Sequence, residues 1–280
     1  MIGIIGQGFV GTAIREGLKN FYDIYTYDLD SSKCNSNLNE ILDKCGIVFQ
    51  CLPTPMRLSG ECDLSIVKSS LYNLNLLVGE KQCEKPIVII KSTVPPGTTE
   101  KLNQIYSNLE VIFSPEFLTE ANHIDDFKNQ TRIILGGTRP ATTKVKTMFR
   151  KAFPKIPIVK TGSRTAEMVK YFLNNFLTVK VLFANEMYQI CKNLDIDYDK
   201  VTEYSLYDTR IGRSHLAVPG PDGDFGVGGH CFPKDLAAMI YLAEQLGVEP
   251  EVLKCVRDKN EKIRTNKDWL FMKGRAISKE

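Results

Sequence analysis

The sequence lacks several features that would direct it to a membrane, a nucleic acid or a metal. No apolar run reaches the roughly 18 residues of a membrane-spanning helix, and no basic segment precedes the first apolar stretch, as it would in a secretory signal. The net charge of +3 is small and no long basic run occurs, so nucleic acid is not an expected partner. Only three histidines and no C-x-x-C pair among eight cysteines argue against a metal site. We therefore expect a cytoplasmic protein with reduced cysteines.

Composition and pattern indicate an α/β protein of two domains. The 280 residues, 43% hydrophobic and 25% charged, have ordinary globular proportions and are enough for two domains. Strands that alternate with helices form a parallel sheet covered by helices on both faces. That alternation predicts a Rossmann-type doubly wound parallel sheet in residues 1–163. The clearest buried-strand runs lie at 47–52, 87–92, 111–113 and 132–137.

The rest of the chain has a helical pattern. Residues 166–190 contain few helix breakers and place apolar residues at helical spacing, which predicts one long helix. Shorter helices are expected at 199–204 and 236–246. The sequence therefore predicts a smaller all-helical domain over residues 164–264, with the long helix at its centre, and a short tail over residues 265–280.

The N-terminus carries a glycine pattern typical of dinucleotide binding. An apolar strand leads into G-x-G-x-x-G at Gly6, Gly8 and Gly11, and a helical stretch follows. A second strand ends at Asp28, near the expected spacing of roughly 20 residues for an acid that binds the ribose hydroxyls. That acid favours NAD over NADP, a preference that Lys33 weakens slightly. The alternative is a glycine-rich turn in an ordinary α/β protein. The predicted cofactor-binding residues of this segment are Gly6, Gly8, Phe9, Val10, Gly11, Asp28 and Lys33.

A second pattern surrounds Cys231, in the segment G-G-H-C-F-P-K-D. The two preceding glycines allow the backbone to approach a ligand closely. A nearby cation such as Lys234 favours the thiolate, and Asp235 could orient a polar group or transfer a proton. These residues indicate covalent catalysis through sulfur. The alternative is a structural cysteine. We expect Cys51 and Cys255 to be core residues.

Taken in order along the chain, these motifs resemble the UDP-glucose/GDP-mannose dehydrogenase family. The resemblance extends to about residue 264. It implies an NAD-dependent enzyme that oxidises the C6 alcohol of a nucleotide sugar to a carboxylate, with two NAD consumed. The matching segments are residues 6–11, 53–55, 92–99, 114–118, 166–171 with Asn174, 210–212, and the segment around Cys231.

The resemblance also implies roles for individual residues. Cys231 would attack the aldehyde, Lys170 and Asn174 would flank the reacting carbon, and Glu116 would assist hydrolysis. Asp235 and Thr93 would hold the hydrolytic water. Further cofactor contacts are implied for Pro53, Thr54, Thr93, Glu120 and Lys234. Substrate contacts are implied for Phe117, Leu118, Glu120, Lys170, Asn174, Arg210 and Gly228. The family arginine at Arg210 reaches the neighbouring subunit, so a homodimer through the central helix is implied.

Family members have a third, nucleotide-binding domain, and residues 265–280 are too few to form it. We therefore expect that domain to come from a separate chain or to be absent. The favoured function is oxidation of UDP-glucose to UDP-glucuronate. Three alternatives stay open: another nucleotide-sugar dehydrogenase, acting on a UDP-N-acetylhexosamine or GDP-mannose; a two-domain β-hydroxyacid dehydrogenase, which needs no cysteine; and an NAD-binding module without activity.

Overall fold

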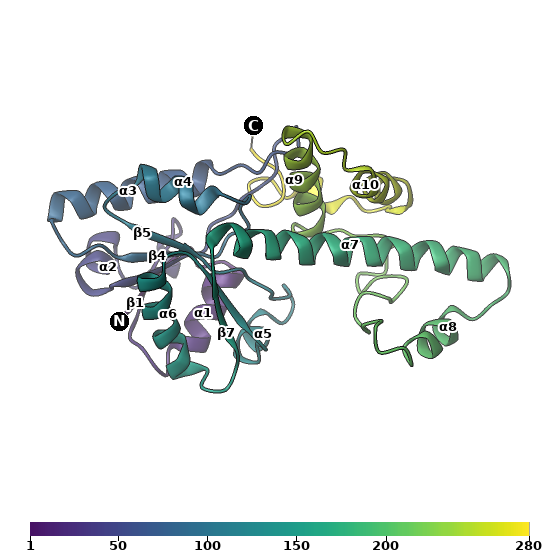
Figure 1. Cartoon of the computed structure of the whole chain (residues 1–280), viewed down its shortest axis with the longest axis horizontal. Coiled ribbons are helices and arrows are strands. Elements are labelled where there is room, and N and C mark those ends of the chain that lie inside the picture. Colours follow the sequence, from purple (N-terminus) through teal and green to yellow (C-terminus); the bar gives the residue numbers. More distant parts are fainter. Residues whose placement is uncertain (280) are drawn as a thin grey trace. The chain divides into compact units, whose positions relative to one another are not determined.

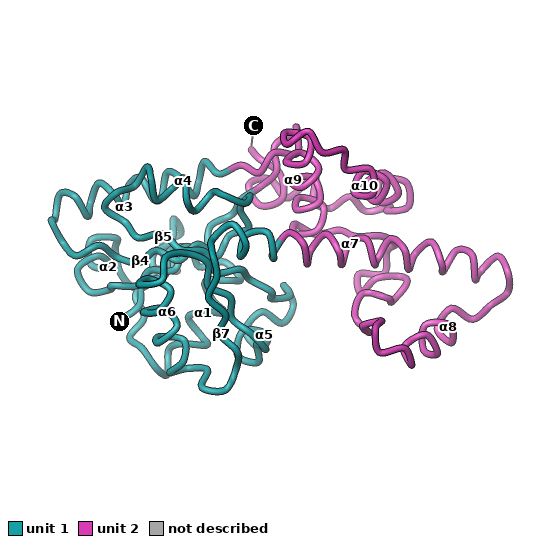
Figure 2. The backbone as a smooth tube through the Cα atoms, viewed as in Figure 1, with its two compact units in different colours: residues 1–54, 64–170 teal, residues 55–63, 171–280 magenta. Residues whose placement is uncertain are grey.

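The computed structural model describes residues 1–279, which form two compact units (Figures 1 and 2). Unit 1 comprises residues 1–54 and 64–170, and unit 2 comprises residues 55–63 and 171–280. The division falls inside the long helix α7 (Ser163–Asn193), after Lys170. None of the helices in residues 1–279 combines the length and the apolar character that a membrane span requires.

Unit 1 contains a seven-stranded sheet in the order β2-β1-β3-β4-β5-β6-β7. All neighbouring strands are parallel except β5 and β6, which pair antiparallel at Phe113 and Gly136. The predicted Rossmann-type sheet is thus confirmed, with one reversed pair that the alternation of strands and helices did not reveal. The strands are β1 (Ile2–Ile5), β2 (Ile24–Tyr27), β3 (Ile47–Gln50), β4 (Ile87–Ile90), β5 (Glu110–Phe113), β6 (Ile133–Gly136) and β7 (Ile158–Thr161).

Helices cover both faces of this sheet. Successive side chains of a strand point to opposite faces, and here the side chains on both faces are apolar and pack against helices. In β4, Ile87 and Ile89 join the core cluster that contains residues of α1, α5 and α6. Val88 and Ile90 join the cluster that contains residues of α2, α3 and α4. Burial on both faces explains why the strands are continuous apolar runs. The helices are α1 (Phe9–Leu18), α2 (Leu38–Lys44), α3 (Ser65–Lys81), α4 (Thr98–Ile105), α5 (His123–Lys128) and α6 (Arg139–Ala152), with a short 3-10 helix η1 (Ser31–Lys33).

The strand order places a ligand-binding edge in unit 1. β1 lies between β2 and β3, so the order of strands along the chain reverses at β1. In doubly wound sheets, ligands bind outside the carboxyl ends of the strands at such a reversal. The residues that follow β1 and β3 at this edge are the glycine turn that begins at Gly6 and the loop that contains Pro53 and Thr54.

Unit 2 consists of helices and their connecting loops. Besides most of α7 it contains α8 (Tyr198–Ser205), α9 (Phe232–Gln245), α10 (Glu251–Ile263) and the 3-10 helix η2 (Asp268–Phe271). Helix α9 begins four residues before the predicted start at 236. Pro233 lies in its first turn, where the missing N–H of proline costs no helical hydrogen bond. The predicted helical part with a long helix is therefore confirmed.

The last part of the chain folds back onto the 55–63 segment within unit 2. The backbone N–H of Met56 donates to the carbonyl of Ala276 at 2.8 Å, and the N–H of Ser278 donates to the carbonyl of Met56 at 2.9 Å. The hydroxyl of Ser278 also donates to the carboxylate of Asp63 at 2.6 Å. Trp269, the single tryptophan, is buried. Residues 265–279 are thus an ordered part of unit 2.

Candidate functional site

Of the three glycines in the turn after β1, two are packed tightly against the backbone and one, Gly8, has open space beside it. Gly6 has a φ of +91°, and a Cβ there would lie 2.3 Å from the carbonyl oxygen of Cys51. A Cβ on Gly11 would lie 1.9 Å from the carbonyl oxygen of Gly6, whereas a Cβ on Gly8 would meet no atom within 4 Å. Packing therefore requires glycine at positions 6 and 11. Gly8 is the N-cap of α1, without a side-chain cap and without an acid in the first turn. Such a helix N-terminus fits a phosphate.

Asp28 closes the same turn from the end of β2. Its carboxylate accepts hydrogen bonds from the backbone N–H of Gln7 at 2.6 Å and of Asp30 at 3.0 Å. Lys33 forms an ion pair with Asp30 at 3.5 Å, on an exposed turn. The predicted acid therefore contacts the residue between the first two glycines of the motif. Its binding to ribose remains a prediction.

The loops after β3 and β4 are joined by side-chain hydrogen bonds. The hydroxyl of Thr54 donates to the carbonyl of Thr93 at 2.8 Å. Ser92 donates its hydroxyl to the carbonyl of Leu52 at 2.5 Å and accepts from the N–H of the same residue at 3.2 Å. The structure thus brings the predicted residues Thr54 and Thr93 together. Pro53, which precedes Thr54 in the loop after β3, is exposed.

Glu167, at the start of α7, fixes the loop before α4. Its fully buried carboxylate accepts from the N–H of Gly97 at 2.6 Å, the N–H of Thr99 at 2.8 Å and the hydroxyl of Thr99 at 2.6 Å. Burial raises the pKa of Glu167 although these hydrogen bonds oppose the shift. Two motifs that are distant in the sequence, 92–99 and 166–171, therefore form one contact, in which Glu167 positions the first turn of α7.

A second buried contact surrounds Glu116. The Lys91 ammonium, nearly inaccessible to solvent, lies 3.3 Å from the Glu116 carboxylate. That carboxylate also accepts from the N–H groups of Phe117 at 2.6 Å and Leu118 at 3.1 Å. The ammonium of Lys170 donates to the backbone carbonyl of Glu116 at 2.5 Å. Sequence reasoning missed Lys91, although a lysine at the end of an apolar strand was a usable signal.

The residues after Glu116 differ in their surroundings. Two cations lie over the Phe117 ring, Arg132 at 4.4 Å and Lys170 at 5.5 Å from the ring centroid. Leu118 packs against the hydrophobic core, so its side chain is partly buried there. Glu120 is exposed, and its carbonyl oxygen lies 2.9 Å from a ring nitrogen of His123.

In unit 2, Cys231 lies at the N-terminus of α9. It is the N-cap residue and is exposed, and its carbonyl accepts from the N–H of Asp235 at 3.0 Å. A helix N-terminus carries partial positive charge, which stabilises a thiolate. The neighbouring Lys234 adds a full positive charge. Within residues 1–279, no group of three or more possible metal-ligating side chains lies close enough to hold an ion.

A buried polar chain supports this cysteine. The Lys234 ammonium lies 2.5 Å from the Asp235 carboxylate, which accepts from the side-chain amide of Asn174 at 2.6 Å. Burial lowers the pKa of Lys234, but the neighbouring Asp235 carboxylate, with further electrostatic contributions from Cys231 and Cys62, outweighs burial, so the net pKa is raised. Lys234 therefore stays charged in unit 2, and the predicted residues Asn174, Lys234 and Asp235 form one hydrogen-bonded group.

Two other predicted residues lie in loops of unit 2. Arg210 is highly exposed and pairs with Asp208 at 2.5 Å, which lowers the pKa of the Asp208 carboxyl. Gly228 lies against Arg264, since a Cβ at position 228 would come within 2.2 Å of the guanidinium. Contacts of Arg210 and Gly228 with a substrate remain predictions. Cys255, expected in the core, is instead exposed on α10.

Comparison with known proteins matches both parts of the chain. The NAD binding domain of the UDP-glucose/GDP-mannose dehydrogenase family matches residues 30–153, and the central domain of that family matches residues 164–262. UDP-glucose 6-dehydrogenase AglM of Haloferax volcanii is 31% identical, over 93% of this chain and 69% of its own length. UDP-glucose 6-dehydrogenase TuaD of Bacillus subtilis is 33% identical, over 83% of this chain and 51% of its own length.

A solved structure agrees with these matches. A UDP-glucose dehydrogenase from Pyrobaculum islandicum superposes with a TM-score of 0.82 at 28% identity. The superposition covers 93% of this chain and 68% of that protein. The chain thus spans between 51% and 69% of the lengths of these three relatives.

Proposed function

The chain belongs to the UDP-glucose/GDP-mannose dehydrogenase family. We propose from this membership that it oxidises the C6 alcohol of a nucleotide sugar to the carboxylate, and that the preferred nucleotide sugar is UDP-glucose. The family uses NAD, and residues 30–153 match its NAD binding domain. The observation that carries the proposal is Cys231 at the N-terminus of α9, beside the charged pair of Lys234 and Asp235. UDP-glucose is favoured because AglM and TuaD are both named for it.

The proposed reaction uses the thiol of Cys231 as a nucleophile. Bound NAD supplies the hydride acceptor for both oxidations. After the first oxidation, the Cys231 sulfur adds to the C6 aldehyde, and the aldehyde oxygen takes up a proton, which gives a thiohemiacetal. Loss of a hydride from carbon and of that proton from oxygen leaves a thioester. Water then displaces the sulfur, which releases the carboxylate and restores the thiol.

Other residues are assigned by the chemistry that each step needs. Negative charge develops on the C6 oxygen, and the ammonium of Lys170 with the amide of Asn174 would stabilise it. Asp235 and Thr93 would orient the hydrolytic water, and Glu116 would move its proton. Gly8 and the start of α1 would receive the pyrophosphate of NAD, with Phe9 and Val10 as the next backbone donors.

A β-hydroxyacid dehydrogenase activity is the main alternative. That reaction is a single oxidation and requires no thiol. The exposed thiol of Cys231 at the N-terminus of α9, beside the Lys234 and Asp235 pair, has no role in such a reaction. The placement of the cysteine therefore favours the double oxidation.

The stoichiometry of the reaction tests this proposal. We expect two NADH for each nucleotide sugar consumed, measured by absorbance, with UDP-glucose, UDP-N-acetylhexosamines and GDP-mannose tested in parallel. The sugar that gives this ratio is the substrate. One NADH per substrate molecule would support the single oxidation, and NAD binding without NADH from any of these sugars would contradict the proposed function.

The exposed face of α7 supports the predicted homodimer. Phe172, Phe176, Phe183 and Ile190 recur at helical spacing and are between 46% and 66% exposed. The rings of Phe172 and Phe176 stack with centroids 6.2 Å apart. Exposed large apolar side chains repeated along one long helix are typical of an interface. We propose that α7 of a second copy of this chain packs against these side chains. Arg210 would then reach the substrate site of that second copy.

We expect light scattering to give the mass of two chains for the unmodified protein. The double substitution Phe172→Glu and Phe176→Glu is expected to give the mass of one chain, because it places charge in the apolar contact. Phe271→Glu is the matched control, since Phe271 is an exposed phenylalanine outside α7. A single-chain mass for the unmodified protein would contradict the dimer.

A further inference from the structure

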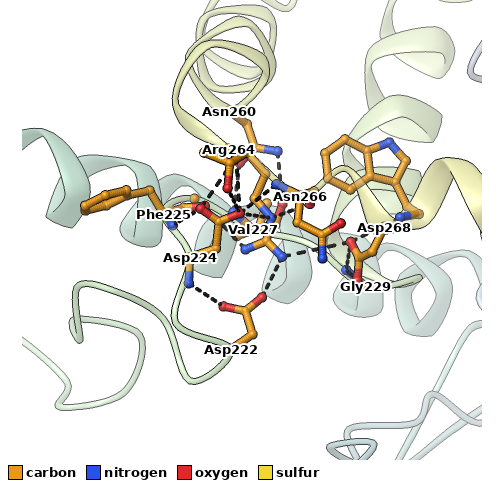
Figure 3. Close-up of polar contacts among 12 residues, drawn as sticks. Asp222, Asp224, Phe225, Val227, Gly229, Asn260, Arg264, Asn266 and Asp268 are labelled. Carbon is orange, nitrogen blue, oxygen red and sulfur yellow. Dashed lines mark hydrogen bonds and ion pairs between the residues drawn. The ribbon is translucent and has the colours of Figure 1, made fainter.

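The loop that leads into Cys231 is held at its backbone by buried amide side chains. The N–H of Gly226 donates to the side-chain oxygen of Asn185 on α7 at 3.1 Å. Asn260 on α10 accepts from the N–H of Val227 at 2.8 Å and donates to the carbonyl of the same residue at 3.0 Å (Figure 3). Two helices therefore fix the loop before it reaches its glycine pair.

The glycine pair itself is fixed by a residue that follows α10. The N–H of Gly229 donates to both carboxylate oxygens of Asp268, at 3.0 and 3.1 Å (Figure 3). Asp268 begins η2, and its carboxylate also accepts from the N–H of Trp269 at 3.1 Å. Gly229 is two residues before Cys231, so Asp268 anchors the backbone close to the thiol.

Arg264 holds Asp268 and the loop in one charged cluster. Its guanidinium is almost fully buried and pairs with Asp222 at 2.5 Å, Asp224 at 3.5 Å and Asp268 at 3.9 Å. It also donates to the carbonyl of Asn266 at 2.8 Å. A buried guanidinium requires such fixed partners, because an unpaired charge in this position is costly. Figure 3 shows the carboxylates of these aspartates directed toward Arg264.

This cluster explains why position 228 is a glycine. A Cβ there would lie 2.2 Å from a guanidinium nitrogen of Arg264 and 2.7 Å from a carboxylate oxygen of Asp268. At position 226 a Cβ would lie 2.3 Å from the side-chain oxygen of Asn260. Glycine at positions 226 and 228 thus admits the polar groups that fix the loop.

We propose that Asp268, held by Arg264, is a positioning residue for Cys231: it anchors the Gly229 backbone so that the thiol stays at the N-terminus of α9, beside Lys234. Arg264 and Asp268 lie beyond residues 164–262, the range that matches the central domain of the family. The expected effect of Asp268 on the rate of oxidation rests on the proposed function. Its expected effect on the chemical reactivity of the Cys231 thiol does not.

The test is the rate at which iodoacetamide alkylates Cys231 near neutral pH, followed by peptide mass spectrometry. With Asp268→Ala we expect this rate to fall on the order of 10-fold, because the released loop no longer holds the thiol where the helix N-terminus and Lys234 favour the thiolate. Asp268→Asn keeps an oxygen acceptor for the Gly229 N–H and is expected to restore most of the rate. The exposed Cys255 is alkylated in the same sample and should react equally in all variants.

Asp222→Ala is the matched control, because it removes a carboxylate from Arg264 without removing a bond to Gly229. Equal losses with Asp222→Ala and Asp268→Ala, or equal losses with Asp268→Asn and Asp268→Ala, would overturn the proposal. Hydrogen exchange in the unmodified chain is an independent test. We expect slow exchange of the Gly229 amide, and exchange as fast as that of an unbonded loop amide would also overturn the proposal.

If the proposed reaction occurs, Asp268→Ala should slow the second oxidation by a similar factor while KM for NAD stays unchanged. A chain without any dehydrogenase activity would contradict the proposed function, and the alkylation rates would still decide the role of Asp268. The two proposals therefore fail separately.

Discussion

Replacing Cys231 with alanine is expected to lower the rate of carboxylate formation, and of the second NADH that accompanies it, by about 10⁴-fold or more, the scale of losing a covalent nucleophile. In the proposed reaction the thiol holds C6 while the second hydride leaves. Within residues 1–279 no other cysteine is the N-cap of a helix next to a buried ion pair. NAD binding should be unchanged, because the glycine turn and Asp28 belong to unit 1. The measurements are NADH formation and NAD affinity for the same preparation.

Cys255→Ala provides the matched control. Cys255 is also an exposed thiol on a helix of unit 2, but α10 begins four residues before it, so it lacks the helix N-terminus. This variant is expected to keep two NADH for each sugar. If Cys231→Ala also gave two NADH for each sugar, sulfur would not be the nucleophile and the proposed chemistry would be wrong.

The fold could be predicted from the sequence because its signals are local. Strands buried on both faces must be apolar throughout, as β4 is, and the glycine turn requires Gly6 and Gly11 for packing. The direction of β6 could not be predicted, because the same apolar run suits a parallel or an antiparallel neighbour. The assignment of residues 55–63 to unit 2 depends on hydrogen bonds to residues near the end of the chain, which no local pattern encodes.

The candidate site shows the same division between local and distant information. Cys231, Lys234 and Asp235 are close in sequence, so their association was predictable. Lys91 was missed because its partner Glu116 lies in the loop after β5, and only the pairing of β4 with β5 brings the ends of these two strands together. Asp268 was missed because its partner Gly229 is separated from it by two helices.

Replacing Lys170 with methionine is expected to lower kcat by about 10²- to 10³-fold, the cost of losing one charged group that stabilises a developing oxyanion. Methionine keeps the length and apolar stem of lysine but removes its charge. The folded structure should tolerate the change, because the Lys170 side chain is only half buried and the neighbouring Glu167 fixes the start of α7. The measurements are kcat and KM for the nucleotide sugar, with thermal unfolding as a check on folding.

The division of the effect between kcat and KM distinguishes catalysis from simple charge attraction. Lys192→Met removes a lysine from the exposed last turn of the same helix and is expected to leave both constants unchanged. If Lys170 served only to attract an anionic substrate, its loss would raise KM and leave kcat intact. A fall in kcat at constant KM would instead mean that the ammonium acts more strongly on the transition state than on the bound sugar, as an oxyanion-stabilising group must. The donation from Lys170 to the carbonyl of Glu116 supports that expectation, because it holds the ammonium in one position before the substrate arrives.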